Sequence, residues 1–299
     1  MSTEEYLAER PRLLGLAYTV LGSWQDAEDA VSEAWLRLAG QKPDDPAAWL
    51  TTVVSRLALD AATTAAKRRE TYVGPWLPEA VLERSVPDNG PQDRILLGER
   101  VDLAFVRLLQ SLSPVDRVIV VLADVADLEH REIAGIVGTT APATRQRLRR
   151  ARSALARSDD RGHPAGADRA TLAALASALN DGDLGALVEQ LSGGCVLWTD
   201  AGGLTRAARN PIRGQDKVRR FLAGLIAKFG MPQVSVVDAV GGPVLQAVST
   251  DMTRIITVEV VDGQVTGLQI QQNPGKIICR WLSHRRTGFP VPGSVGGRW

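Results

Sequence analysis

Cysteine and histidine are scarce in this chain of 299 residues, which holds two cysteines and three histidines. So few thiols exclude a disulfide framework and a four-cysteine zinc site, and we expect no metal or other cofactor. The apolar runs are far shorter than the roughly 18 residues that cross a bilayer. The first residues are charged and lack the apolar core of a signal peptide, so we expect a cytoplasmic protein with no membrane partner.

Net charge is also nearly absent, at +1, which excludes a uniformly basic nucleic-acid coat but not a local basic surface. The charges are unevenly distributed along the chain. Residues 1–72 carry 8 basic and 11 acidic side chains, whereas residues 97–158 carry 10 basic and 7 acidic ones. This segregation predicts that different parts of the chain meet different partners.

Two segments rich in proline, glycine and aspartate, residues 86–92 and 158–168, divide the chain. The length predicts two or three domains. We expect domains at 1–72, 97–158 and 168–279, linkers at 73–96 and 159–167, and a basic tail at 280–299. The periodicity predicts that the first two domains are all-α and that the third is α+β.

The first domain contains a helix with one acidic face. Gly22 ends the preceding helix, Ser23 is the expected N-cap, and Gly40 is expected to close the helix. Asp26, Asp29 and Glu33 recur at spacings of three and four residues, opposite an apolar stripe. Such a face is either merely solvated or a docking surface for a basic partner.

A third helix is predicted to begin at Pro46, after Asp45 as its N-cap. Its end carries the basic run Lys67, Arg68 and Arg69. These cations either favour the negative end of the helix dipole or contribute to a binding surface.

The second domain is predicted to contain a helix-turn-helix. A short apolar helix ends at Gly138, and either Thr139 or Thr140 caps the next helix, with Pro142 in its first turn. Between Thr140 and Arg157 the chain has six arginines and no acidic residue. A short helix, a glycine turn and an arginine-rich helix are typical of insertion into the major groove of DNA. The alternative is a basic helix that is only solvated.

The third domain is predicted to be a small cone of helices and a curved antiparallel sheet. Asp262-Gly263 indicates a hairpin turn, and a helix over 218–229 is expected to bury Phe221, Leu222, Leu225 and Phe229. None of the three histidines lies in this domain, so an acid–base pair would have to come from Asp200, Asp251 or Glu259. No nucleophile, metal or dinucleotide motif is present, which argues against an enzyme. Cys195 and Cys279 are expected to be buried thiols.

These residues resemble a known family. The strings GSWQDAEDAVSEAWLRL and AWLTTVVSRLALD are similar to region 2 of bacterial extracytoplasmic-function sigma factors, and residues 112–155 are similar to their region 4. Three further strings, GPWLPE (74–79), DAGG (200–203) and NPGK (273–276), resemble the subgroup with a SnoaL-like C-terminal domain. The resemblance implies an alternative sigma factor that binds core RNA polymerase and promoter DNA. It also implies regulation in cis by the C-terminal domain, with no separate anti-sigma factor.

The resemblance also implies roles for individual residues. It assigns docking on core polymerase to Asp26, Asp29, Glu33 and Trp35. It assigns contacts to the −10 element to Trp49, Arg56, Lys67, Arg68 and Arg69. Contacts to the −35 element are assigned to Thr140, Arg145, Gln146, Arg149, Arg150 and Arg152. Regulatory contacts between domains are assigned to Trp76, Leu77, Pro78, Glu79, Asp200, Gly202, Gly203, Asn273, Pro274 and Lys276.

The chain departs from the family pattern at three places. Residues 61–66 (AATTAA) replace an arginine-containing stretch, which predicts weaker −10 engagement. Leu204 stands where the glycine loop usually has lysine, so any ion pair made through that lysine is absent; Ala201, Gly275 and Ile277 are further substitutions in these strings. The tail 280–299 matches no family string.

Two functions remain open on the sequence alone. The leading one is the sigma factor. The alternative is a helix-turn-helix transcription regulator whose α+β domain senses a small molecule; a small-molecule ligand in that domain is compatible with either function. A cyclase or isomerase activity is disfavoured because the third domain lacks histidine.

Overall fold

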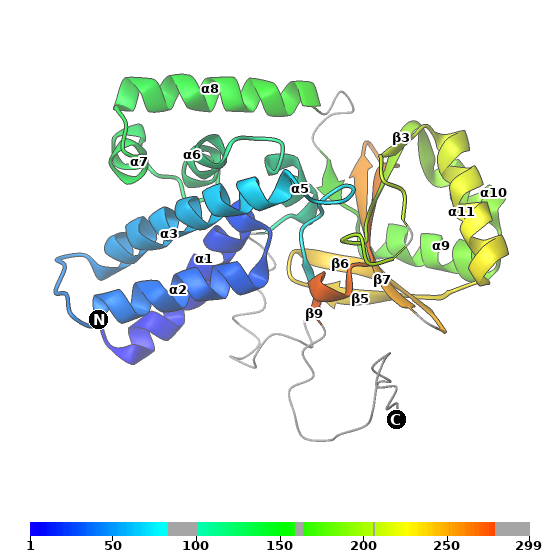
Figure 1. Cartoon of the computed structure of the whole chain (residues 1–299), viewed down its shortest axis with the longest axis horizontal. Helices are drawn as coiled ribbons and strands as arrows, with labels where there is room; N and C mark the ends of the chain where they lie inside the picture. Colours follow the sequence, from blue (N-terminus) through cyan, green and yellow to red (C-terminus); the bar gives the residue numbers. More distant parts are fainter. Residues whose placement is uncertain (83–100, 159–163, 206, 251, 279–299) are drawn as a thin grey trace, which may run out of the picture.

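The computed structural model describes residues 1–82, 101–158 and 164–278, apart from residues 206 and 251. Cys279, Asp251, the tail 280–299 and parts of both expected linkers lie outside the described residues. Within the described ranges no helix is long and apolar enough to span a membrane. Figure 1 shows the helical part of the chain on one side of the molecule and the sheet-containing C-terminal domain on the other.

The N-terminal unit is three helices: α1 (Thr3–Leu21), α2 (Trp24–Leu38) and α3 (Pro46–Arg69). The expected caps are present, because the side chain of Ser23 accepts from Asp26 N and that of Asp45 accepts from Ala48 N. Gly22 ends α1 with a left-handed φ of 66°. Gly40 does not close α2: the helix ends at Leu38 with Ala39 in a right-handed conformation, so no glycine is required there.

In the second unit, residues 101–158 form the helices α5 (Leu103–Leu109), α6 (Pro114–Asp124), α7 (His130–Val137) and α8 (Ala141–Ser158). Gly138, with φ 72°, makes the left-handed turn between α7 and α8. The Thr140 hydroxyl accepts from Ala143 N at 3.4 Å, so Thr140 is the residue that caps α8. The predicted helix-turn-helix is therefore present.

The two helical units share one hydrophobic core. Leu50 and Val54 of α3 lie in the same buried cluster as Ile119 and Leu122 of α6. The buried Arg117 of α6 donates to the backbone oxygen of Val20 in α1 at 2.9 Å. Val240, Val244 and Ile255 of the C-terminal domain extend this cluster, so all three parts of the chain pack together.

The C-terminal domain begins with α9 (Arg169–Asn180) and α10 (Leu184–Gln190). The strands are β3 (Leu191–Asp200), β4 (Ile212–Arg213), β5 (Gln233–Ala239), β6 (Gly242–Ser249), β7 (Met252–Val261) and β8 (Gln264–Gln271). Helix α11 (Gln215–Phe229) connects β4 to β5.

The sheet has the order β4-β3-β8-β7-β6-β5, and β2 (Ala165–Gly166) pairs with β7. Every pair along this order is antiparallel except β3–β8, which is parallel, so the sheet is mixed. Asp262 and Gly263 both have positive φ, as expected for a two-residue hairpin turn.

Two burial predictions have different outcomes. Cys195 is buried, as expected. Phe229, by contrast, is 51% exposed, because α11 ends at this residue, at one end of a cavity between the helix and the sheet.

A further small sheet ties the chain together at a distance. β1 (Ala80–Val81) pairs in parallel with β9 (Ile277–Ile278), which follows the short 3-10 turn η2 (Pro274–Lys276). The segment that follows α3 is thus hydrogen-bonded to the end of the described C-terminal domain.

Candidate nucleic-acid interface and domain junction

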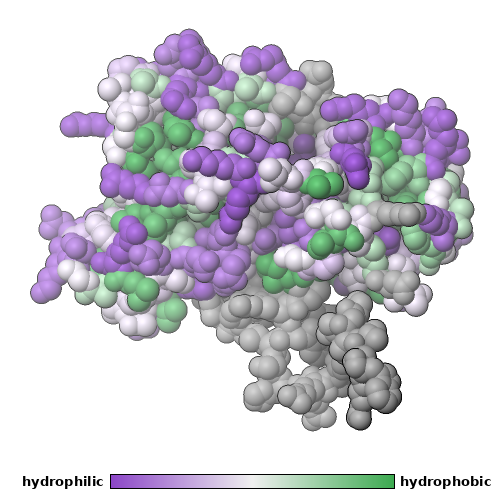
Figure 2. All heavy atoms as spheres, in the orientation of Figure 1, coloured by the Kyte–Doolittle hydropathy of each residue, from purple (hydrophilic) through white to green (hydrophobic). Residues whose placement is uncertain are grey.

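Helix α8 carries a cationic surface at the edge of the molecule (Figure 1). Leu148, Ala151 and Leu155 form its buried stripe. Arg145, Gln146, Arg149 and Arg150 are exposed on the remaining circumference. Hydrophilic side chains crowd this edge in Figure 2.

Two arginines of α8 are held by carboxylates of α6. Arg147 Nε donates to Asp116 at 2.8 Å, and Arg152 pairs with Asp124. Both arginines keep exposed area, so these are surface ion pairs with little energetic weight. They connect α8 to α6, and Arg149 and Arg150 are exposed beside them.

The acidic face of α2 is present as expected. Asp29 and Glu33 are exposed, and Asp26 is half-buried near the helix start. Glu33 pairs with Arg37 of the same helix at 2.9 Å. Trp35 stacks on Tyr6 with ring centroids 4.0 Å apart, and the neighbouring Leu36 is 67% exposed.

The predicted −10 residues on α3 do not share one surface. Lys67 and Arg68 are exposed, and Trp49 is half-buried. Arg56 donates to two backbone oxygens of α7, Gly135 O at 2.9 Å and Ile136 O at 3.3 Å.

Arg69 is half-buried, with its guanidinium packed on the segment that follows α3. Its guanidinium lies 3.3 Å from the centroid of the Trp76 ring and donates to Leu21 O and to Gln110. Burial lowers the pKa of Arg69 to about 10. Of the predicted run Lys67–Arg69, Lys67 and Arg68 are thus exposed, whereas Arg69 is half-buried against Trp76 in this arrangement.

Asp200, at the end of β3, is the centre of a buried junction between the C-terminal domain and the segment after α3. Its carboxylate accepts from Tyr72 Oη at 2.5 Å, from Leu77 N at 2.9 Å and from Lys276 Nζ at 2.6 Å. The Asp200 side chain is fully buried and that of Lys276 is 11% exposed. We call Asp200, Lys276, Tyr72, Trp76 and Leu77 the Asp200 junction.

Trp76 is the aromatic centre of this junction. Lys276 Nζ lies 4.0 Å from the centroid of its ring, and Arg69 lies 3.3 Å from the same centroid. A Cβ atom at Gly22 would come within 2.7 Å of the ring, so the glycine that ends α1 also makes room for Trp76. The indole therefore contacts cations from both the N-terminal unit and the C-terminal domain.

The other residues predicted to make contacts between domains lie partly in the segment after α3 and partly in the C-terminal domain. Asn273 donates to Tyr72 Oη at 3.0 Å, and a Cβ atom at Gly202 would overlap the Asn273 amide. Gly203 packs near Val73, and Pro274 is an exposed turn residue that begins η2. Pro78 is buried, and its oxygen accepts from Gln271 at 3.3 Å.

Glu79 contacts the N-terminal unit. Its carboxylate accepts from Trp24 N at 2.6 Å, and its backbone oxygen accepts from the Tyr18 hydroxyl. Burial raises the pKa of Glu79. It therefore attaches the WLPE string to the start of α2 rather than to the C-terminal domain.

A second contact between domains has no counterpart in the sequence analysis. Arg107 of α5 makes two hydrogen bonds to Glu259 of β7, at 2.5 and 3.0 Å, and lies 4.2 Å from the Trp198 ring centroid. Gln269 donates to the same carboxylate at 2.7 Å. Glu259 was considered only as a catalytic acid. Its neighbours instead make it an ion-pair partner that joins the second helical unit to the sheet.

The electrostatics of Lys276 predict a pH dependence. Burial lowers the pKa of Lys276 to about 8, although Asp200 opposes this shift. The ordinary value of about 10.4 returns when the residue is exposed, so the unfolded chain binds more protons between about pH 8 and 10.4. The free energy of unfolding therefore rises with pH between about 8 and 10.4, and this gain is lost as pH falls back through 8.

We expect the wild type to gain stability relative to Lys276→Met between pH 7.5 and 9.5, by at most about 1.4 kcal/mol per pH unit. The measurement is urea unfolding of both proteins across this range. Lys42→Met, which removes an exposed lysine, serves as the matched control and should show a constant difference. A wild-type advantage that falls with rising pH would contradict the assignment.

Comparisons with known proteins agree with the sequence resemblance. The Sigma-70 region 2 family matches residues 6–68, and the Sigma-70 region 4 family matches residues 102–155. The chain is 36% identical over 304 residues to ECF RNA polymerase sigma factor SigJ of Mycobacterium tuberculosis, covering 96% of each protein. It is 29% identical over 279 residues to the probable ECF RNA polymerase sigma factor SigI of the same species, covering 90% of this chain and 92% of SigI.

The fold agrees as well. The crystal structure of M. tuberculosis SigJ matches with a TM-score of 0.75 and 32% identity, and the match covers 92% of this chain and 98% of SigJ. The likeness therefore extends through the C-terminal domain, beyond the two helical regions.

Proposed function

The chain belongs to the extracytoplasmic-function RNA polymerase sigma factors, and from that premise we propose which of its surfaces carry each step and how its C-terminal domain controls them. It is an alternative sigma factor that directs transcription initiation, and its family catalyses no reaction of its own. A helix-turn-helix regulator without polymerase is not favoured, because it would leave the region 2 helices without a role.

The acidic face of α2 is the proposed contact to core polymerase. Asp26, Asp29 and Glu33 supply the charge, while Trp35, stacked on Tyr6, and the exposed Leu36 supply apolar area. Charge complementarity sets the association rate and specificity of such an interface, and the apolar centre contributes most of its affinity.

We expect the double reversal Asp29→Lys with Glu33→Lys to weaken core-polymerase binding about tenfold or more, because two attractive contacts become repulsive. Binding of labelled sigma factor to core polymerase measures the effect. Glu189→Lys with Asp216→Lys, an equal charge change at exposed positions of the C-terminal domain, is the matched control. Equal affinity of the acidic-face variant and the control would refute the docking role.

The DNA contacts are proposed on two separate helices. Trp49, Arg56, Lys67 and Arg68 of α3, joined by Arg69 once its buried contacts open, would face the −10 element. Thr140, Arg145, Gln146, Arg149, Arg150 and Arg152 of α8 would face the −35 element. Arginine can bind both phosphates and guanine edges, and aromatic side chains hold unstacked bases.

The two DNA-binding surfaces cannot reach their elements in this arrangement. The −35 and −10 elements are about 25 base pairs apart, which is about 85 Å of duplex at about 3.4 Å per base pair. In the structure α3 and α7 are in contact, since Arg56 of α3 donates to Gly135 O and Ile136 O. This direct contact is the observation that carries the proposal: the arrangement is closed, and promoter engagement requires the two helical units to separate.

The C-terminal domain is proposed to hold the closed arrangement in cis. It binds the segment after α3 through the Asp200 junction and binds α5 through Arg107 and Glu259. Leu204, at the position where the family string has a loop lysine, is 70% exposed, and Lys276 makes an ion pair with Asp200. A domain that contacts both helical units needs no separate anti-sigma factor to keep them together.

Run-off transcription with core polymerase and a library of promoter fragments tests the proposal as a whole. The full chain should initiate from a subset of promoters, and variants that break the Asp200 junction should initiate faster from the same subset. If these variants initiated more slowly while remaining folded and bound to polymerase, the domain would be an activator and the closed-state account would be wrong.

A further inference from the structure

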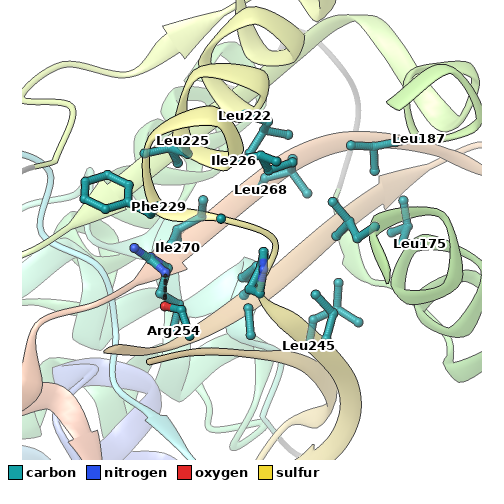
Figure 3. Close-up of a pocket in the computed structure, with 17 residues that line it drawn as sticks. Leu175, Leu187, Leu222, Leu225, Ile226, Phe229, Leu245, Arg254, Leu268 and Ile270 are labelled. Carbon is teal, nitrogen blue, oxygen red and sulfur yellow. Dashed lines mark hydrogen bonds between the residues drawn. The ribbon is translucent and has the colours of Figure 1, made fainter. Parts of the chain in front are cut away.

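The C-terminal domain encloses a cavity that the promoter-binding account does not use. Its volume is about 80 Å³, and it lies between α11, α9 and α10 and the strands β5 to β8. Figure 3 shows the side chains of Leu222, Leu225 and Ile226 from α11 facing those of Leu268 and Ile270. The engineered apolar cavity that admits benzene measures about 150 Å³, so this one, at about half that volume, suits a short alkyl chain.

Polar groups occur at one end of the cavity only. Arg254 and Phe229 lie together at that end, and Leu175 and Leu187 lie at the other (Figure 3). Among the described residues that line the cavity, only Arg254 and Ser249 have polar side chains, and none is acidic or histidine. A cavity with these walls can bind a molecule, but it offers no general acid or base to convert it.

Arg254 has hydrogen-bond partners but no counter-ion among the described residues. Its Nε donates to Gln272 Oε1 at 3.2 Å and its Nη1 donates to Ser249 Oγ at 3.3 Å, both neutral acceptors. Burial lowers the pKa of Arg254. A guanidinium has five N–H donors and binds carboxylates bidentately, so this side chain retains the donors that an anion would use.

We propose that this cavity binds a small amphipathic monocarboxylate, with its short alkyl chain among the leucines and its carboxylate on Arg254. An apolar ligand would leave the half-buried guanidinium without a counter-ion, and a multiply charged anion would find no second cation in the described cavity wall.

Strand β8 connects this cavity to both domain contacts. Leu268 and Ile270 line the cavity on one face of the sheet. The alternating residues Gln269 and Gln271 point to the other face, where they make contacts to the rest of the chain. Gln269 donates to Glu259, the partner of Arg107, and Gln271 donates to the Pro78 oxygen and to Asp200. Gln272, which accepts from Arg254, also donates from its backbone to Asp200 O at 2.9 Å. Occupancy of the cavity is therefore coupled to the contacts that hold the closed arrangement; this coupling, unlike binding itself, rests on the proposed cis regulation.

Calorimetric titration of the full chain tests binding without polymerase or DNA. The probes are hexanoate and its neutral analogue 1-hexanol. We expect saturable hexanoate binding that is about tenfold or more tighter than hexanol binding, because only the acid forms charge-assisted hydrogen bonds. Arg254→Met should remove this preference. Arg220→Met, at an exposed position of α11, is the matched control and should keep it.

Each outcome bears on one part of the proposal. The proposed carboxylate site is refuted if the wild type shows no saturable hexanoate binding, or if it binds hexanoate and 1-hexanol with equal affinity. Neither of these tests requires a variant. Leu222→Trp, which fills the cavity from the half-buried side of α11, should abolish binding even if Arg254→Met fails to fold. Hexanoate binding that leaves the promoter affinity of wild type unchanged overturns the coupling through β8. Cis regulation is tested separately, by junction variants without any ligand.

Discussion

Replacement of Asp200 by alanine is expected to destabilise the closed arrangement by about 3–5 kcal/mol, because it leaves the Lys276 cation buried without its counter-ion. Tyr72 and the backbone N–H of Leu77 lose the same acceptor. Opening of the chain restores water to all three groups. Because about 1.4 kcal/mol corresponds to a factor of ten, the open fraction should rise by two orders of magnitude or more.

Promoter affinity and run-off rate measure this effect, and both should increase. Asp238→Ala is the matched control: it removes a carboxylate that pairs with Arg169 in the same domain, but both side chains are about half exposed. Such a surface pair contributes under about 1 kcal/mol. Adding Lys276→Met to Asp200→Ala removes the stranded charge, so the double variant should recover much of the closed state. If Asp200→Ala and Asp238→Ala changed promoter affinity and run-off rate equally, the Asp200 junction would not be the contact that holds the closed arrangement.

Replacement of Arg149 and Arg150 by alanine should lower the affinity for promoter DNA about tenfold or more. The logarithmic dependence of affinity on salt should also become less steep by about two, because each lost phosphate contact releases about one counter-ion fewer. Both side chains are exposed, so the fold should remain intact. Fluorescence anisotropy with a labelled promoter fragment across a salt series gives both quantities, measured with polymerase present.

The control for these variants is Arg219→Ala with Arg220→Ala, which removes the same charge from exposed positions of α11. It should leave the salt dependence nearly unchanged, because those arginines lie outside the proposed DNA surface. If the α8 variant kept the affinity and salt dependence of the wild type, or if the control changed them equally, helix α8 would not be the promoter-binding surface.

Local features of the fold were predictable because local chemistry determines them. Asp45 before Pro46, the glycine turn at Gly138 and the Asp262-Gly263 hairpin each combine a backbone requirement with a residue that meets it. The carboxylates of α2 were visible for a similar reason, since their spacing of three and four residues is that of a helix face, and the six arginines of α8 were visible from composition.

Long-range partners were not predictable from the single sequence. Arg107 and Glu259 are 152 residues apart, and neither occurs in a recognisable string. Tyr72 lies two residues before the glycine-proline-tryptophan segment (74–76) that the resemblance identifies, but nothing local indicates that its hydroxyl meets Asp200. The family strings located one side of the Asp200 junction at Trp76 and Leu77 and the other at Asp200 and Lys276, without showing that the two sides are paired.

Two residues differ from expectation because helix periodicity does not specify what a residue at the end of a helix packs against. Arg69 ends a basic run that reads as a surface, yet Trp76 covers it. Phe229 occupies an apolar position of α11, yet it lies at the end of the helix beside a cavity and remains 51% exposed. Periodicity identifies which residues share a face, but the packing of the whole chain decides what that face meets.

The central claim is that α3 and α8 separate when the sigma factor engages a promoter. The most direct test is the distance between fluorescent labels at Thr63→Cys on α3 and Ser153→Cys on α8, both exposed positions, with Cys279→Ser removing one native thiol and Cys195 buried. We predict an increase by tens of ångströms when core polymerase and promoter are added, in proportion to the roughly 85 Å between the elements. An unchanged distance in complexes that produce run-off transcript would contradict the closed-state account.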